Sequence, residues 1–212
     1  MSKIRLTEPN REILARRDSI INDLTRLVDP AGLITSTDEC RAYETDALTA
    51  YRKMPLAVVL PKTTEEVSAV LKYCHDTGVK VVPRGAGTSL AGGAIPSEDA
   101  VVLGLSKMNR VLAVNYDDRF IRVEAGVTNL SVTAVVAENG FFYAPDPSSQ
   151  LACTIGGNIA NNSGGAHCLK YGVTTNNLLG VRMVLIDGSI IDLGGDYLDS
   201  AGLDLLGLVV GS

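Results

Sequence analysis

The sequence predicts an α+β fold, and two pairs of neighbouring strands carry that prediction. Residues 55–83 have the pattern strand, helix, strand, which is the connection that joins parallel strands. Residues 178–193 instead have the pattern of two strands joined at Asp187-Gly188, a dipeptide typical of antiparallel hairpins. Because crossover and hairpin connections occur in one chain, we expect a mixed fold and not a doubly wound parallel sheet.

Composition limits the classes of protein to which the chain can belong. It has 212 residues, of which 46% are hydrophobic, so it can bury a core as one large domain or two small lobes. The net charge is −5, there is no tryptophan and no basic run, so we expect no nucleic-acid partner. No apolar stretch approaches the roughly 20 residues of a membrane span, and "MSKIRLTEPN" has no apolar signal region. We therefore expect a soluble, cytoplasmic protein without a transmembrane segment.

The N-terminal part of the chain predicts one helix. From residue 1 to about residue 28, apolar side chains recur near helical spacing with charges between them. The stretch "DPAG" then interrupts the pattern, and residues 35–53 are polar and irregular. We accordingly separate a helical segment, residues 1–50, from the main domain, residues 51–212.

The main domain begins with the strand–helix–strand pattern. Residues 56–60, "LAVVL", predict a short buried strand, and "VKVV" at 79–82 predicts the next. Between them, Thr63 and Glu66 have the spacing of a capping box, and Gly78 is a stop signal. These signals predict a helix from Thr63 to Thr77.

The remaining elements alternate between strands and one helix. The apolar runs 101–105, 110–114 and 120–126 predict strands, and residues 128–140 predict a helix that ends at Gly140. A proline-rich turn, "YAPDPSSQ", follows at 143–150 and precedes the hairpin of 178–193.

A glycine-rich loop, "PRGAGTSLAGGA" at 83–94, directly follows the second strand. Glycine allows positive φ and close approach of another group, and a run of free N–H groups on such a loop binds anions. The loop does not match a P-loop, because no lysine follows Gly92-Gly93-Ala94, nor a Rossmann fingerprint, because the sixth position from Gly85 is Leu90. We interpret it as a phosphate cradle of another family; a glycine-rich turn without a ligand is the alternative.

A second small-residue segment, "TIGGNIANNSGG" at 154–165, strengthens the phosphate interpretation. Glycines at both of its ends flank asparagines and a serine, a composition suited to a flat, polar ligand. We expect the N–H groups near Gly156 and Gly157 to bond ligand oxygens. Two such segments about 70 residues apart suggest one long ligand held at both ends.

Cysteine and histidine spacing does not indicate a metal site. No two cysteines form C-x-x-C, and the pairs of neighbouring Cys and His lack the four regularly spaced ligands of a zinc site. We expect that the chain binds no metal and that its cysteines are reduced thiols, some of them buried. We expect one histidine at a helix end and the other in a loop. These residues are Cys40, Cys74, Cys153, Cys168, His75 and His167.

Three motifs in order give the chain a family resemblance. They are "PRGAGTSLAGG", "PDPSSQLACTIGGNIANNSGG" and "KYGVTTNNLLGVRMVLIDGSI". Together they resemble the FAD-binding domain of the vanillyl-alcohol oxidase / p-cresol methylhydroxylase superfamily, on the branch of FAD-linked glycolate oxidase subunits and D-lactate dehydrogenases. The resemblance covers the chain from about residue 40 to its last residue. It implies a two-lobed domain with a small strand–helix–strand lobe and a lobe built on a mixed or antiparallel sheet with helices.

The resemblance implies a set of FAD-binding residues. The first motif resembles a pyrophosphate loop that works through backbone N–H groups, and the later motifs resemble segments near the flavin ring, the ribityl chain and the phosphates. Some relatives carry a histidine that links to the flavin where this chain has Thr88, so we expect noncovalent FAD. The implied residues are Arg84, Gly85, Ala86, Gly87, Thr88, Ser89, Leu90, Asp146, Thr154, Gly156, Gly157, Asn158, Ala160, Ser163, Gly164, Tyr171 and Gly172.

The resemblance also implies an activity. A full-length relative would transfer a hydride from a 2-hydroxy acid, such as glycolate or D-lactate, to FAD, alongside other glycolate oxidase subunits. No residue of this chain matches a catalytic base. In the family the motif continues beyond "LVVGS", so we expect an FAD-binding domain that is incomplete at its C-terminal end and lacks the substrate domain. The alternatives are an FAD-binding module without turnover, or a fragment whose open sheet edges prevent independent folding.

Overall fold

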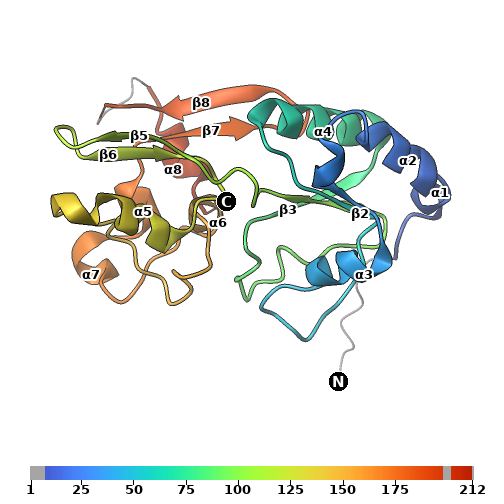
Figure 1. Cartoon of the computed structure of the whole chain (residues 1–212), viewed down its shortest axis with the longest axis horizontal. Helices are drawn as coiled ribbons and strands as arrows, with labels where there is room; N and C mark the ends of the chain where they lie inside the picture. Colours follow the sequence, from blue (N-terminus) through green and yellow to red (C-terminus); the bar gives the residue numbers. More distant parts are fainter. Residues whose placement is uncertain (1–7, 198–201, 212) are drawn as a thin grey trace. The chain divides into compact units, whose positions relative to one another are not determined.

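The computed structural model describes residues 8–197 and 202–211, and the chain divides into two compact units (Figure 1). Unit 1 comprises the chain up to Gly104 together with residues 186–188. Unit 2 comprises residues 105–185 and the chain from Ser189 onward. None of the helices within the described ranges is long and apolar enough to cross a membrane.

Unit 1 combines short helices with a four-stranded sheet. Its elements are α1 (Arg11–Ala15), α2 (Arg17–Leu24), the 3-10 turn η1 (Pro30–Gly32), β1 (Leu33–Ile34), α3 (Thr37–Cys40), the 3-10 turn η2 (Arg41–Tyr43), β2 (Ala57–Val59), α4 (Thr64–Thr77), β3 (Lys80–Arg84) and β4 (Ala100–Gly104).

The sheet of unit 1 has the order β1-β2-β4-β3, so its last strand in sequence is an inner strand. β4 pairs in parallel with both β2 and β3, whereas β1 pairs antiparallel with β2. Every residue of β2 and β4 is buried, as expected for strands covered on both faces. Figure 1 shows α4 on one side of this sheet and α3 on the other. On the α3 side, Cys40 packs with Val58, Leu60 and Val102.

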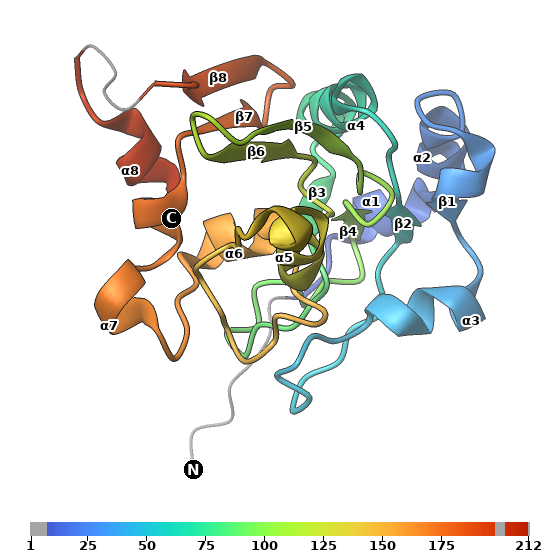
Figure 2. The same cartoon turned by 60° about the vertical axis from the view of Figure 1, so that its left-hand side comes forward.

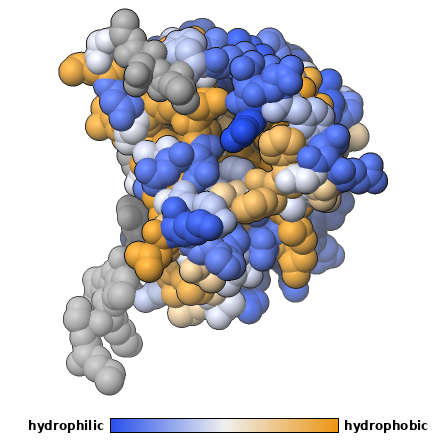
Figure 3. All heavy atoms as spheres, turned by 90° about the vertical axis from the view of Figure 1, so that its left-hand side faces the viewer, coloured by the Kyte–Doolittle hydropathy of each residue, from blue (hydrophilic) through white to orange (hydrophobic). Residues whose placement is uncertain are grey.

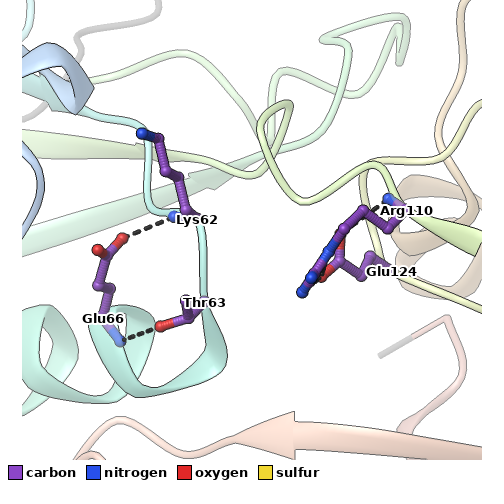
Figure 4. Close-up of polar contacts among 5 residues, drawn as sticks. All are labelled: Lys62, Thr63, Glu66, Arg110 and Glu124. Atoms are coloured by element: carbon purple, nitrogen blue, oxygen red, sulfur yellow. Dashed lines mark hydrogen bonds and ion pairs between the residues drawn. The ribbon is translucent and has the colours of Figure 1, made fainter. Parts of the chain in front are cut away.

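Helix α4 confirms the predicted start and stop signals. The side chain of Thr63 accepts a hydrogen bond from the N–H of Glu66 at 3.2 Å (Figure 4). The Glu66 carboxylate accepts from the N–H of Lys62 at 2.6 Å, one residue before the cap, so the reciprocal bond of the capping box is displaced by one position. Gly78 ends the helix with φ at 73°, which favours glycine.

The predicted N-terminal helix is two short helices in the structure. The break lies at Arg16, where φ is −95° and ψ is 8°, and its N–H bonds the carbonyl of Ile13 at 3.1 Å. The apolar stripe still points inward, because Ile13, Ile20 and Leu24 are buried. The helix ends at Leu24, earlier than expected, and the first seven residues of the prediction lie outside the described residues. Two short elements were not expected: β1 at residues 33–34, and α3 within the polar stretch 35–53.

Unit 2 contains two separate two-stranded sheets and several short helices. Its elements are β5 (Val111–Asn115), β6 (Phe120–Val123), α5 (Asn129–Val136), the 3-10 turn η3 (Ala137–Asn139), α6 (Ile155–Asn161), α7 (Cys168–Tyr171), the 3-10 turn η4 (Thr174–Asn177), β7 (Gly180–Val184), β8 (Ile190–Gly194) and α8 (Leu205–Val209).

The core of unit 2 lies between β6 and two helices. Figure 2 shows α5 and α6 on the same side of the β5–β6 ribbon. Val132 of α5 and Ile155 of α6 form a buried cluster with Val127, and Ile121 and Val123 of β6 pack against it. The mixture of strands and helices in both units confirms the predicted α+β class.

A buried carboxylate holds the start of the β5–β6 ribbon. Glu124 is 8% exposed and accepts three hydrogen bonds from Arg110, from its backbone N–H at 2.8 Å and its guanidinium at 3.0 and 2.7 Å (Figure 4). The bonds from Arg110 outweigh the effect of burial and lower the pKa of Glu124. This pair joins the two strands where they enter the ribbon.

The hairpin of 178–193 is confirmed, with β7 and β8 antiparallel and Gly188 in the turn at φ 86°. The predicted helix 128–140 ends its α-helical part at Val136 and finishes as a 3-10 turn before Gly140, where φ is 77°. Helices α6, α7 and α8 were not predicted. Unit 2 also exposes large apolar side chains, among them Leu169, Leu203 and Leu208, and apolar areas are visible on the face in Figure 3.

Candidate functional site

The glycine-rich loop leaves β3 at Arg84 and leads to β4 in unit 1. The backbone N–H groups of residues 85–88 donate no hydrogen bond to any residue in the described ranges. Gly87 and Gly92 have φ of 70° and 78°, which prevents the loop from continuing as regular structure. Four consecutive unpaired N–H groups are the arrangement that binds a phosphate or another anion.

The loop is fastened to the irregular segment 41–53. The carbonyl of Gly87 accepts a hydrogen bond from the N–H of Ala47 at 3.0 Å. A further bond, from the N–H of Ile95 to the carbonyl of Gly92 at 3.1 Å, closes a turn within the loop. No pattern in the sequence indicates the role of this segment, because it has neither periodicity nor a motif.

The side chain of Arg84 lies inside unit 1. Its Nη1 donates to the carbonyl of Thr45 at 2.7 Å and, less favourably, to that of Ala94 at 3.4 Å, and its guanidinium lies 5.6 Å from the Tyr43 ring centre. Burial lowers the pKa of Arg84, and the negative charge of Asp46 opposes that effect.

The far end of the loop is anchored by a fully buried carboxylate, Asp99. It accepts hydrogen bonds from Lys80 Nζ at 2.8 Å, Ser97 Oγ at 2.6 Å and the backbone N–H of Asn10 at 2.8 Å. Burial alone would raise the pKa of Asp99, but these bonds outweigh it and lower the pKa to about 2. The carboxylate therefore stays ionised and joins the N-terminal helices, β3 and β4.

The second segment, in unit 2, forms helix α6. Thr154 is its N-cap and accepts from the N–H of Gly157 at 3.2 Å, while the N–H of Gly156 donates to the carbonyl of Ala125 at 2.8 Å. Both N–H groups thus donate within the chain, and the expectation that N–H groups near Gly156 and Gly157 bond a ligand stays a prediction. A Cβ on Gly156 would lie 2.9 Å from that of Ala125, so glycine is needed there for close packing.

Asn158 of α6 is the one predicted residue of this segment whose side chain is both buried and unpartnered in the described ranges. It is 1% exposed, and neither Oδ1 nor Nδ2 has a hydrogen-bond partner there. An unsatisfied buried amide costs free energy unless a group from outside supplies the bonds. Asn158 therefore fits a polar ligand such as the edge of a flavin.

The end of α6 leads into a tightly packed turn. Ser163 accepts at its carbonyl from both the N–H and the hydroxyl of Thr174, at 2.9 and 2.7 Å. Gly164 packs against Val173, where a Cβ would lie 2.9 Å from Cγ1.

The end of α7 places the last two of the expected residues. Gly172 has φ of 76° and ends α7, and the ring of Tyr171 meets that of Phe142 edge-on at 5.7 Å.

Asp146 lies beside His167, a partner that sequence reasoning did not find. His167 donates its backbone N–H to Oδ1 at 3.2 Å, and its Nδ1 lies 2.5 Å from Oδ2. These bonds to His167 lower the pKa of Asp146. The signal was weak, because 21 residues separate the pair. His75 lies in the last turn of α4, as expected.

Comparison with known proteins identifies the family. Residues 55–194 match the FAD binding domain family. Glycolate oxidase subunit GlcD of Escherichia coli (strain K12) is 48% identical over 196 residues, which are 92% of this chain and 39% of that protein. D-lactate dehydrogenase of Archaeoglobus fulgidus is 40% identical over 196 residues and is covered to 43%. The chain thus spans about two fifths of the length of these relatives.

Solved structures show the same fold. Alkyldihydroxyacetonephosphate synthase has a TM-score of 0.80 at 21% identity, over 99% of this chain and 39% of that one. p-Cresol methylhydroxylase has a TM-score of 0.74 at 19% identity, over 93% of this chain and 38% of that one. The unpaired N–H groups of residues 85–88 and the unpartnered amide of Asn158 fit the cofactor that the family binds, FAD. The resemblance stated from the three sequence motifs is confirmed, and the chain belongs to the FAD-binding domain family.

Proposed function

We propose that this chain is the flavin-binding part of an FAD-dependent oxidoreductase that oxidises a 2-hydroxy acid such as glycolate or D-lactate. The observation that carries the proposal is the run of N–H groups at residues 85–88 that have no partner in ranges 8–197 and 202–211, within a sequence that matches FAD-binding domains. The named relatives act on glycolate, D-lactate and D-2-hydroxyglutarate, which share a hydroxyl group beside a carboxylate.

We propose cofactor contacts for each unit by itself, through backbone N–H groups in unit 1 and through side chains in unit 2. The loop 84–90 would bind the pyrophosphate with its N–H groups, and Asn158 would offer one donor and one acceptor to the polar edge of the flavin ring. Asp146, Thr154, Ala160, Ser163, Gly164, Tyr171 and Gly172 would line the remainder, with Gly156 and Gly157 holding α6 in place.

Oxidation of a 2-hydroxy acid to a 2-oxo acid removes two electrons and two protons, and FAD when bound supplies the two-electron acceptor. The residues of this chain would bind and orient that acceptor. None of them is assigned as a catalytic base. The second candidate is an FAD-binding module without turnover, because the residues assigned in this chain hold the cofactor and none of them is assigned a role on a substrate.

The proposal also covers the attachment of FAD, the location of the protein and its partners. We propose noncovalent FAD, because Thr88 stands where some relatives carry a histidine linked to flavin, a cytoplasmic location, and other glycolate oxidase subunits as partners. The exposed apolar side chains of unit 2 support a polypeptide partner. We further propose that residues 51–212 are the FAD-binding domain and residues 1–50 a preceding helical segment.

The first experiment is the visible absorbance spectrum of the purified chain after incubation with FAD and desalting. We expect a retained flavin spectrum, and acid precipitation should release all of the flavin to the supernatant. A folded chain that retains no flavin would overturn the binding proposal, and flavin in the acid pellet would overturn noncovalent attachment.

Anaerobic addition of glycolate or D-lactate to the loaded chain separates the two candidates. Loss of the oxidised flavin absorbance near 450 nm, with formation of the 2-oxo acid, would establish turnover. A spectrum unchanged by either acid would favour the binding module. Succinate, which lacks the 2-hydroxyl group, is the matched control acid.

A further inference from the structure

The glycine-rich loop of unit 1 encloses a group of its own chain. Arg84 ends β3, and its guanidinium bonds the carbonyl of Thr45 at 2.7 Å and that of Ala94 at 3.4 Å. Thr45 belongs to the irregular segment, and Ala94 lies near the far end of the loop. One side chain therefore links the start of the loop, its end and the segment to which it is fastened.

Gly87 faces this guanidinium. A Cβ on Gly87 would lie 2.6 Å from Cζ and 3.1 Å from Nε of Arg84, and φ at Gly87 is 70°. The carbonyl of Gly87 is already bonded to the N–H of Ala47 at 3.0 Å. The space that the missing side chain of Gly87 leaves open is thus occupied by Arg84, whereas the sequence predicted that it admits a ligand.

The charge of Arg84 is balanced from within unit 1. Asp46, which is 5% exposed, acts on the guanidinium through its negative charge. Its Oδ1 accepts from the N–H of Leu48 at 2.8 Å, and its buried Oδ2 has no hydrogen-bond partner in the described ranges. Because Nη1 of Arg84 donates to two carbonyl groups of its own chain, the guanidinium is not oriented to bind a phosphate with two parallel hydrogen bonds.

We propose that Arg84 is a positioning residue: its guanidinium fills the space over Gly87 and holds the loop so that the N–H groups of residues 85–88 stay unpaired for the cofactor. The backbone, and not this side chain, then binds the pyrophosphate. This inference rests on the proposed function for the identity of the ligand, but the packing between Arg84 and Gly87 is a property of the chain alone.

A double-mutant cycle without FAD tests the packing. In the full chain, Gly87→Ala should lower Tm strongly, because the new methyl overlaps the guanidinium and also suffers strain at positive φ. In an Arg84→Ala background only the strain remains, so the drop in Tm should be less than half as large. Equal drops in the two backgrounds would overturn the proposal.

Two glycines of the same loop are matched controls. Gly92 has φ of 78°, but its Cβ would meet nothing closer than Leu48 Cδ2 at 3.4 Å, so Gly92→Ala reports the strain alone. A Cβ on Gly93 would meet no described residue within 4 Å, so Gly93→Ala reports neither effect. The drop for Gly87→Ala should exceed both in the native background and match that of Gly92→Ala when Arg84 is absent.

FAD binding and chemical rescue test the positioning role. Arg84→Ala should weaken FAD binding at least tenfold, and millimolar ethylguanidinium should restore both Tm and affinity, whereas ethylammonium should restore neither. If Arg84→Ala cannot be purified folded, Arg84→Lys replaces it in the cycle and in the binding assay.

Lost FAD binding with an unchanged Tm would mean direct contact between Arg84 and the cofactor and would overturn the proposal. Absence of flavin from the native chain would instead refute the proposed function, while the cycle would still report on the packing.

Discussion

The two glycine-rich segments, 84–94 in unit 1 and 154–165 in unit 2, contain four glycines each. They differ in the groups that they leave available to a ligand, which are backbone N–H groups in the first and a side chain in the second. In the first, Nη1 of Arg84 donates to carbonyl groups of its own chain, and the N–H groups of residues 85–88 have no partner among the described residues. In the second, the N–H groups of Gly156 and Gly157 are engaged and the side chain of Asn158 is unpartnered. Similar composition therefore produces a backbone site in one case and a side-chain site in the other.

The difference follows from backbone conformation. Gly87 and Gly92 have positive φ, so the first segment cannot form a helix and leaves its N–H groups without partners. None of the four glycines in the second segment has positive φ. Residues 155–161 form α6, and in a helix the backbone N–H groups donate to carbonyl groups of the preceding turn. Counting glycines cannot separate these outcomes, because both conformations are open to glycine.

The largest expected effect is in the second segment. Gly165→Ala places a Cβ inside contact distance of the backbone carbonyl of Asp146, which cannot rotate away as a side chain could. We expect a loss of about 3 kcal/mol in the free energy of unfolding, measured by urea denaturation. Gly93→Ala, with open space around its Cβ, is the control. A loss no greater than that of the control would show that the 144–147 turn is not rigid.

The second largest effect is expected for Asp99, the carboxylate that follows the first segment, and acid titration measures it. The pKa of Asp99, at the end of the first loop, is lowered to about 2 on folding. Its contribution, on the order of 2 kcal/mol, is fully present above the unfolded pKa near 3.9 and is lost as pH falls through about 2. The free energy of unfolding should therefore fall between pH 4 and pH 2, and Asp99→Asn should flatten that fall. An equal pH dependence in the variant would contradict the assignment.

Asn158→Leu should change stability and binding in opposite directions. Removing an unsatisfied buried amide should raise the free energy of unfolding of the FAD-free chain by about 1 kcal/mol. The same variant should retain less flavin after desalting, because the donor and acceptor for the ring are lost. A variant that is less stable without FAD would indicate that Asn158 is satisfied within the protein, and the comparison between the segments would fail.

The smallest effect is expected for Gly93→Ala. Its Cβ meets nothing within 4 Å in the part of the chain that the structure describes, and its φ is not positive, so the free energy of unfolding should change by no more than about 0.5 kcal/mol. Flavin retention should match the native chain. If this variant loses flavin, the part of the loop beyond residues 85–88 also approaches the cofactor.

Elements with strong local signals were predictable, and those fixed by distant partners were not. Helix α4 has a cap, an apolar stripe and a glycine stop, and its bounds agree with the expectation. Helix α6 has no such signals: its residues are small and amidic, and it forms because Thr154 caps it and Ile155 is buried against Val127. The roles of Ala47, Thr45 and His167 depend on contacts 40, 39 and 21 residues away, which periodicity does not report.

The strand order of unit 1 also sets the sequence of events in its folding. β3 pairs only with β4, and β4 lies between β3 and β2, so the central strand of β2-β4-β3 is synthesised last. In the folded sheet β2 and β3 lie two strand spacings apart, roughly 9.6 Å, and β4 occupies the position between them, so this part of the sheet cannot form before residues 100–104 leave the ribosome. The glycine-rich loop is the segment that carries β4 into that gap. Its N–H groups are therefore brought into place by the same step that completes the sheet, and a nascent chain that stops before β4 has no phosphate cradle.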